Sequence, residues 1–450
     1  MSSGVALLVD FGASRVKAAL FHAGENRILL RAERPSPEPR WGNGGEVEID
    51  PRAHAAMLDE LAAELCAPRL AAPSSVWLCS EMHGFVLDDG RGAALTRYIS
   101  WRDMRAARAS PGEPESTFDR CRREFGDEFF SITGMRLKPG LPFINLVHIA
   151  RCGGLPPRSR FLSLPEWIAA SAGTYSGNVH TTMAAASGFY DLGQRDWSTR
   201  LMDMGVGRAS AMDFGVPSDF GGVGLGTVKV AGRTLPLFGG FGDLQTAIFG
   251  AGVPNRSNAA INLGTGSQVV RLARSPVPAV ERRPYFNDQV LAAITHIPSG
   301  RALNVFAGLF DAIGEASGGS RGAFWRLFGT LSAEEILAAP LPVDLNVFPG
   351  SWRFGRGGSI AGILESGTAV PLLVASVALG WLGQYAGALD MVDPGREEGQ
   401  VVLAGGLVRR CQAAPAVLET MTGRHMLPPE GEEDETITGL AAAARGVMGR

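Results

Sequence analysis

The chain has 450 residues, which is more than one hydrophobic core usually serves, so the length predicts two domains. Hydrophobic residues make up 45% of the chain and charged residues 19%, a composition that excludes an intrinsically disordered protein. A net charge of −3 without any block of Lys or Arg excludes a nucleic-acid-binding surface, and five scattered cysteines exclude a disulfide framework or a zinc site.

The first 35 residues contain three apolar runs, VALLVDFG, RVKAALFHA and RILLRAERP, separated by short glycine-containing or polar turns. This pattern predicts a three-stranded meander. Asp50 and Pro51 then form the N-cap and first position of a predicted amphipathic helix. The next apolar run, SSVWLCS, predicts a strand that ends at Glu81, Met82 and His83. Because α/β sheets place ligands at the carboxyl ends of their strands, we expect these three residues to face a ligand.

The second half of the chain repeats the pattern of the first. The run LPLFGGFGD predicts a buried strand that leads into a helix at Asp243, and we expect the domain boundary just before it, near residue 235. The segment AAINLGTGSQVVRLA then matches ALLVDFGASRVKAAL, with Asn262 in the place of Asp10 and Gly264 in the place of Gly12. The run QVLAAITHI completes a second meander, and GQVVLAGG predicts a later strand. This self-similarity indicates a duplicated architecture.

Residues 366–389 carry no charge and are numerous enough to cross a bilayer. The many alanines and glycines of this segment favour a helix buried in a large domain over a membrane span. The N-terminal residues lack a basic region followed by a long apolar run, so no secretory signal is predicted. We therefore expect a cytoplasmic protein without a membrane partner.

The turn in DFGASRVK has the residues for binding phosphate. Its backbone N–H groups and the Ser14 hydroxyl are donors, Lys17 is a nearby cation, and Asp10 is able to hold the water shell of a magnesium ion. A single turn of this kind is equally well explained as an ordinary glycine hairpin. The second copy, LGTGS with Gly264 and Thr265, favours the phosphate-binding interpretation, because two such turns can bracket one nucleotide.

The chain resembles the FGGY carbohydrate kinases over nearly its whole length. The resemblance is carried by DFGASRVK, SEMHGFVLDDG with ISWRDMR, GFGDLQTAIFGAG, NLGTGSQVV and VLAGGLVRR, in that order. Within the family, GDLQ, RPYFN and AAASGFYDLGQRDWS are most similar to the sedoheptulokinase branch.

The resemblance implies an α/β protein with two ribonuclease H-like domains of the actin/hexokinase ATPase type that flank a cleft. Residues 1–235 would hold the sugar site and the first phosphate loop, and residues 236–450 the catalytic aspartate, the second phosphate loop and the adenosine site. The implied reaction is the ATP- and Mg²⁺-dependent transfer of the γ-phosphoryl group to a terminal hydroxyl of a ketose such as sedoheptulose. The partners would be ATP and a small-molecule sugar, with a homodimer left open.

The resemblance also implies a role for each motif residue. Asp243 would be the general base and would contact the sugar. The remaining sugar contacts would be Glu81, Met82, His83, Trp101 and Asp103. The nucleotide and its metal would be held by Asp10 (also the magnesium contact), Gly12, Ala13, Ser14, Lys17, Gly264, Thr265, Gly405 and Gly406. Simpler structural roles stay open for Asp243 as a helix N-cap, for His83 as a core histidine and for Trp101 as a packing residue.

The chain departs from the family pattern at several positions. Ala13 stands where threonine is usual, Leu244 stands beside the aspartate where asparagine is usual, and GSWRFGRGG is a weak version of a G-E-R segment. These changes remove a hydroxyl from the phosphate loop and one sugar contact. They leave open a xylulose, ribulose or glycerol kinase, and also a non-catalytic nucleotide-binding regulator of the same fold.

Overall fold

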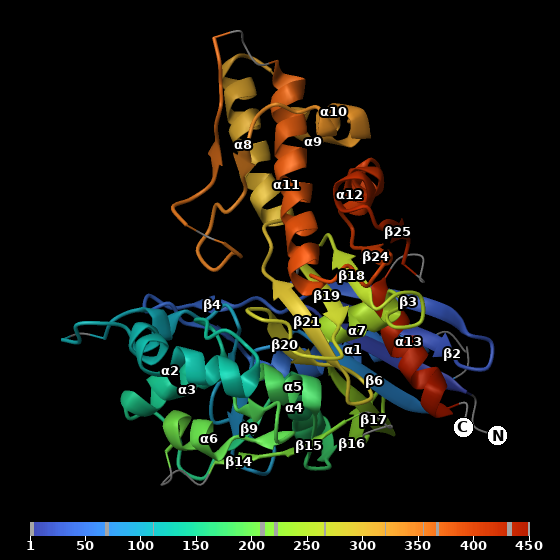
Figure 1. Ribbon diagram of the computed structural model, residues 1–450. Coiled ribbons are helices and arrows are strands. Elements are labelled where there is room, and N and C mark those ends of the chain that lie inside the picture. The colour runs from blue at the N-terminus through green and yellow to red at the C-terminus, as the bar shows by residue number, and fades with distance from the viewer. Residues whose placement is uncertain are drawn as a thin grey trace. The chain divides into compact units, whose positions relative to one another are not determined.

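The computed structural model describes residues 4–67, 72–110, 112–207, 212–219, 224–264, 267–319, 321–353, 355–365, 369–429 and 434–448. The chain divides into two compact units (Figure 1). Unit 1 comprises Met1–Gly250, Glu281–Val290 and Thr436–Arg450, and unit 2 comprises Ala251–Val280 and Leu291–Glu435.

The main sheet of unit 1 runs in the order β10-β16-β17-β6-β1-β2-β3. The predicted first meander is confirmed: β1 (Val5–Phe11), β2 (Arg15–His22) and β3 (Arg27–Pro35) pair antiparallel. The predicted strand β6 (Ser75–Ser80) pairs parallel with β1, and β17 (Arg233–Gly242) pairs parallel with β6. The strands β16 (Gly224–Val230) and β10 (Gly173–Tyr175) extend the sheet antiparallel.

Helix α1 (Pro51–Cys66) begins as predicted, because the Asp50 side chain accepts a hydrogen bond from the backbone N–H of Arg52 at 3.1 Å. Its buried face packs with α4 (Leu164–Ala172) in the same apolar core as the sheet. The other helices of unit 1 are η1 (Arg105–Ala107), α2 (Thr117–Thr133), α3 (Pro142–Arg151), α5 (Thr181–Ala186), α6 (Thr199–Gly205), α7 (Asp243–Gly250) and α13 (Glu435–Met448), whose first residue is counted with unit 2.

Shorter strands complete unit 1. They are β4 (Arg40–Trp41), β5 (Val47–Ile49), β7 (Val86–Asp88), β8 (Tyr98–Ile99), β9 (Arg160–Leu162), β11 (Asn178–His180), β12 (Tyr190–Asp191), β13 (Asp196–Trp197), β14 (Asp213–Phe214), β15 (Val216–Ser218) and β20 (Glu281–Pro284). A second apolar core, rich in phenylalanine, lies beneath α2, α3 and α6 and includes Phe129, Phe143 and Phe189.

Unit 2 repeats the topology of unit 1, as the self-similarity predicts. The strands β18 (Ala259–Asn262), β19 (Gln268–Leu272) and β21 (Val290–Thr295) form an antiparallel meander. Its first strand pairs parallel with β24 (Gln400–Ala404), which pairs parallel with β25 (His425–Leu427). The register places Asn262 opposite Gln268, just as Asp10 lies opposite Lys17 in unit 1.

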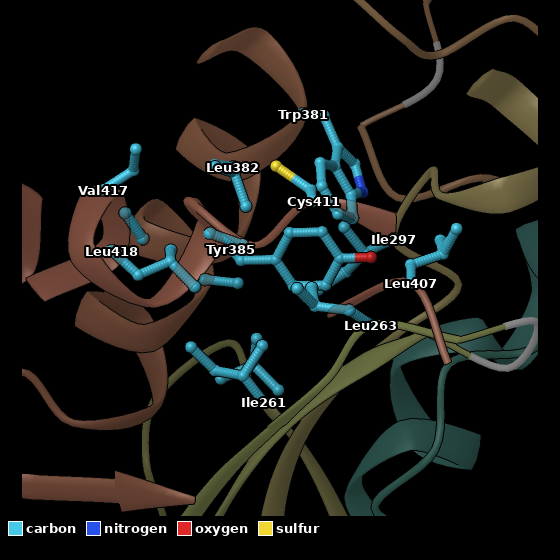
Figure 2. Close-up of a cluster of buried hydrophobic side chains, with 14 of the residues drawn as sticks. Ile261, Leu263, Ile297, Trp381, Leu382, Tyr385, Leu407, Cys411, Val417 and Leu418 are labelled. Carbon is cyan, nitrogen blue, oxygen red and sulfur yellow. The ribbon is translucent and has the colours of Figure 1, made fainter. Parts of the chain in front are cut away.

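Helix α11 (Val370–Val392) includes residues 370–389 of the long uncharged segment, and among the described residues it is the one helix long and apolar enough to cross a membrane. The prediction of a buried core helix is confirmed, because 61% of the most apolar 18-residue stretch of α11 is buried. Figure 2 shows Trp381 and Tyr385 of this helix among side chains from β18 and α12, including Ile261 and Leu418. The other elements of unit 2 are α8 (Gly300–Ala316), α9 (Ala323–Thr330), α10 (Ala333–Leu337), β22 (Val343–Asp344), β23 (Ser359–Ile360), η2 (Val408–Arg410) and α12 (Ala414–Thr422).

The predicted domain boundary at residue 235 falls inside β17. Because β17 is hydrogen-bonded to β6 and β16, it belongs to the sheet of unit 1 together with α7, which follows it. Unit 1 continues to Gly250, and the chain first enters unit 2 at Ala251. Asp243 therefore lies in unit 1.

Candidate active site

Three carboxylates lie at one edge of the main sheet of unit 1. Asp10 is the penultimate residue of β1, Glu81 follows β6 directly, and Asp243 follows β17 directly. These strands are parallel neighbours, so their carboxyl ends meet at the same edge. The sheet therefore collects acidic groups from three segments that are far apart in the sequence.

Asp243 has a carboxyl group suited to accepting a proton. Burial raises its pKa to about 7, and the negative charges of Asp10 and Glu81 act in the same direction. Its Oδ1 accepts a hydrogen bond from the backbone N–H of Leu244 at 2.8 Å, which fixes the side chain at the first turn of α7. A base whose pKa lies near neutrality combines availability at physiological pH with proton affinity.

Glu81 is buried, and its two oxygens accept hydrogen bonds from Tyr98 Oη at 2.8 Å and Trp101 Nε1 at 3.0 Å. Burial raises the pKa of Glu81. Because both oxygens already have donors, the geometry gives Glu81 the role of positioning the half-buried Trp101 ring. Met82 is also buried, with its sulfur against the backbone at Gly242.

His83 has a backbone φ of +65°, which is uncommon for a residue other than glycine and often marks a functional position. Its Nδ1 lies 2.7 Å from the carbonyl oxygen of Ala186. Because a carbonyl oxygen only accepts, Nδ1 carries the proton and Nε2 is left as an acceptor. Burial and the nearby Arg283 charge lower the pKa of His83 to about 3, so the neutral ring is able to accept a hydrogen bond from a hydroxyl group.

Asp103 does not have the geometry expected of a sugar contact. It is fully buried, one of its oxygens accepts from the backbone N–H of Val47 at 2.8 Å, and Arg105 binds both oxygens through Nε and Nη2 at 2.9 and 2.7 Å. Arg105 also contacts Glu48 at 2.6 Å. This network joins the loop that carries Trp101 to β5, so Asp103 holds that loop in place.

Two further side chains at this site are not among the predicted site residues. Gln245 is fully buried, its Nε2 donates to the carbonyl oxygen of Pro284 at 3.1 Å, and its Oε1 is buried without a partner beside Gly242. Thr436 donates through Oγ1 to Asp10 Oδ2 at 2.7 Å, although it comes from the last helix of the chain. An unpartnered amide oxygen near Asp243 is a natural acceptor for a substrate hydroxyl.

The first predicted phosphate loop is the turn between β1 and β2. The Gly12 N–H donates to Arg15 O at 3.1 Å, so this N–H is used within the turn, while Ser14 is exposed and Ala13 is half-buried. Lys17 Nζ lies 3.9 Å from Asp10 Oδ2. The turn therefore brings one ammonium group close to one carboxylate and leaves the Ser14 hydroxyl exposed.

Among the described residues, no group of three or more His, Cys, Asp and Glu side chains is arranged to hold a metal ion alone. The single Asp10 carboxylate fits Mg²⁺, because that ion usually keeps several waters and phosphate oxygens as ligands and takes one or two carboxylates from the protein. A magnesium ion held there would neutralise phosphate charge during transfer.

Unit 2 carries a corresponding strand-end site. Gly405 has φ +100°, and a Cβ atom there would lie 2.4 Å from Asn262 Oδ1 and 2.5 Å from Leu263 O. Gly406 faces open space, and Asn262 Oδ1 is buried without a partner. Gly264 precedes the turn, whereas Thr265 lies outside the described residues. The close approach of two backbones explains why glycine stands at 405.

No model of a known protein family matches the chain. A glycerol kinase from Gloeobacter violaceus is 27% identical over 281 residues, which are 60% of this chain and 52% of the relative. An autoinducer-2 kinase from Escherichia coli is 25% identical over 375 residues, which are 77% of this chain and 64% of the relative. Among solved structures, a gluconate kinase from Lactobacillus acidophilus matches with a TM-score of 0.82 at 17% identity, over 99% of this chain and 90% of the other. Plasmodium falciparum glycerol kinase with ADP matches with a TM-score of 0.77 at 14% identity, over 98% and 88%.

In sequence the chain is similar to curated glycerol and autoinducer-2 kinases, and in fold it is similar to solved gluconate and glycerol kinases. The expected α/β fold of the actin/hexokinase type is thereby confirmed. The chain spans between about half and two thirds of the length of the curated relatives described above. The sedoheptulokinase branch expected from the motifs has no support in these comparisons.

Proposed function

We propose that this FGGY-type protein is a cytoplasmic kinase that transfers the γ-phosphoryl group of ATP, with Mg²⁺, to a terminal hydroxyl of a carbohydrate. The observation that carries the proposal is Asp243, a carboxylate with a raised pKa beside Asp10 and Glu81. Phosphoryl transfer needs positioning, charge stabilisation and a base for the attacking hydroxyl, and these three strand ends supply residues for each task.

The residues divide into an acceptor group and a nucleotide group. His83 Nε2, Gln245 Oε1 and the Trp101 ring would hold the carbohydrate, while Asp243 takes the proton of its hydroxyl. The nucleotide would be held by Asp10, Ser14 and Lys17 in unit 1, and by Gly264, Thr265, Gly405 and Gly406 in unit 2. The names of the relatives support a polyhydroxylated acceptor, and ADP in the related glycerol kinase supports ATP as the donor.

The finer identity of the acceptor is open between several sugars. A ketose such as sedoheptulose follows from the motif likeness alone, whereas a glycerol- or xylulose-type acceptor agrees with the names of the relatives and matched structures. A non-catalytic regulator of the same fold is the alternative of a different class. It predicts nucleotide binding without ADP formation on any acceptor.

Replacing Asp243 by asparagine tests the proposal, because the change keeps the size of the side chain and removes the proton acceptor. We expect kcat to fall by roughly 10²- to 10⁴-fold at saturating acceptor, with ATP affinity unchanged. The matched variant Asp10→Asn should show a defect that lessens as magnesium is raised, whereas the Asp243→Asn defect should not. A kcat for Asp243→Asn above about half of the wild-type value would remove the basis for assigning the base.

A further inference from the structure

Three charged side chains meet beside His83 in unit 1. Lys138 Nζ lies 3.1 Å from Glu281 Oε1, and Arg283 Nη2 lies 2.9 Å from Glu281 Oε2. Lys138 precedes α3, whereas Glu281 and Arg283 are both on β20, so the group joins distant parts of the chain. The group holds two cations and one carboxylate.

Arg283 is the least accessible member of the group and has unused hydrogen-bonding capacity. Its side chain is 4% exposed, Nη1 contacts the sulfur of Met135, and the buried Nε has no partner. A buried guanidinium group is costly unless its donors are satisfied, and the best acceptor for its forked N–H groups is a carboxylate. Within the described part of the chain, Glu281 is the carboxylate bound to Arg283, and it is shared with Lys138.

This cationic group lies next to the predicted acceptor residues. The positive charges of Arg283 and Lys138 both act on His83, whose neutral ring is the acceptor described above. Pro284, the residue after Arg283, accepts the hydrogen bond from Gln245, which is two residues beyond Asp243. Strand β20 therefore connects the cationic group to the segment that carries the proposed base.

The two ends of this region have opposite charges. Asp10, Glu81 and Asp243 form the acidic end, and Lys138 and Arg283 form the cationic end with Glu281 between them. An acceptor with a carboxylate at one end would be repelled by the acidic end and attracted by the cationic end. Its far hydroxyl would then point to Asp243.

We propose that the carbohydrate acceptor is a sugar acid, whose carboxylate is held by Arg283 and Lys138 while its terminal hydroxyl faces Asp243. The inference rests on the proposed kinase function and adds the chemical class of the acceptor. Lys138 is the half-buried member of the pair, and it meets the ligand from the more open side. His83 Nε2 accepts from a hydroxyl in the middle of the chain of the sugar acid.

The experiment compares sugar acids with polyols that differ from them only in the carboxylate. Aldonates of five to seven carbons, each paired with the alditol of the same configuration, are assayed for ADP formation with the full chain and Mg-ATP. We expect the best aldonate to exceed its alditol by about 10-fold or more in kcat/KM, with an advantage that shrinks as salt is added. Calorimetry with the same pairs measures binding without turnover.

Lys138→Met provides the variant test, because this half-buried lysine is easier to replace than Arg283 without loss of folding. It should weaken aldonate binding by about 10-fold or more and leave alditol binding and the KM for ATP unchanged. Lys229→Met, which changes an exposed lysine on β16, is the matched control and should change none of these constants.

The outcomes separate the two proposals. Equal or better use of alditols or neutral ketoses, or an equal effect of Lys138→Met on acids and polyols, would overturn the sugar-acid inference and leave the kinase intact. ADP formation that never depends on an acceptor would instead contradict the kinase function. In that case the calorimetric difference between acid and polyol, and its loss in Lys138→Met, still decides whether this group binds a carboxylate.

Discussion

Asp243 titrates near neutrality because it is buried beside two other carboxylates, and this gives the proposed reaction a defined pH dependence. The base acts in its ionised form, and a pKa of about 7 means that the ionised fraction falls roughly 10-fold for each pH unit below that value. We expect kcat/KM for the acceptor to rise with pH and to level off above about 7. A pH–rate profile at saturating Mg-ATP measures this.

The residual activity of Asp243→Asn is the control for that profile, since it should lack the rise near pH 7. A wild-type rate that stays flat between pH 5 and 8 would show that proton transfer to this carboxylate does not limit the reaction.

His83 is held as a neutral acceptor by its bond to Ala186 O, so replacing it should affect the acceptor and not the nucleotide. His83→Ala removes Nε2, and loss of one such buried polar contact costs about 1–3 kcal/mol, which is roughly 5- to 150-fold in kcat/KM for the carbohydrate. The KM for ATP should not change. His22→Ala, on the edge of β2, is a control with a half-exposed histidine. Equal weakening of ATP binding in calorimetry would count against the acceptor role.

At the level of elements, the sequence predicts the strands and their ends better than it predicts which side chains from distant segments contact those ends. Asp10, Glu81 and Asp243 each follow an apolar run with β-forming residues, so their positions at strand ends can be predicted locally. Thr436 and Gln245 contact the same site through tertiary packing. Thr436 has no neighbouring motif, and the GDLQ motif that contains Gln245 does not show what its amide group contacts. Pairing between distant segments is not encoded in any short window of the sequence.

Asp103 shows the opposite limit of motif reasoning. Its motif lies at the predicted acceptor site, and the motif alone does not distinguish a ligand contact from an internal support. The structure shows Arg105 and the Val47 N–H occupying both carboxylate oxygens. The difference arises because Arg105, two residues later in the 3-10 turn, lies within reach of the same side chain.

The end of β24 offers a test with two adjacent glycines. Gly405→Ala must place a Cβ atom against Asn262 and Leu263 at φ +100°, and the backbone strain alone costs about 1–3 kcal/mol. Gly406→Ala meets open space, so the free energy of unfolding should change by less than about 0.5 kcal/mol. If Gly406 lies against the nucleotide, the KM for ATP should rise in this variant without a change in stability.

Chemical denaturation and ATP titration of both variants measure these effects. Gly399→Ala, at an exposed glycine that also faces open space, is the control and should change neither quantity. Unchanged ATP binding in Gly406→Ala would contradict the proposed adenosine contact.

On the scale of the whole chain, the duplicated topology gives each unit a core of its own. The cores of units 1 and 2 are built around different tryptophans, Trp167 of α4 and Trp381 of α11, both buried. Trp167 Nε1 donates to Pro51 O at 3.2 Å, and Trp381 Nε1 lies 3.3 Å from Ser299 Oγ. The two tryptophans therefore form a matched pair for testing whether unit 1 and unit 2 unfold independently.

Trp381→Phe and Trp167→Phe each remove ring volume and one buried hydrogen bond, so each should destabilise its own core by about 1–3 kcal/mol. Because each ring contacts side chains of its own unit, the loss should speed amide hydrogen exchange in that unit alone. We expect Trp381→Phe to raise exchange in β18, β24 and α12, and Trp167→Phe to raise it in β1, β6 and β17. Exchange that rises equally in all six elements in either variant would show that the chain unfolds as one cooperative body, and the two cores would then not be independent.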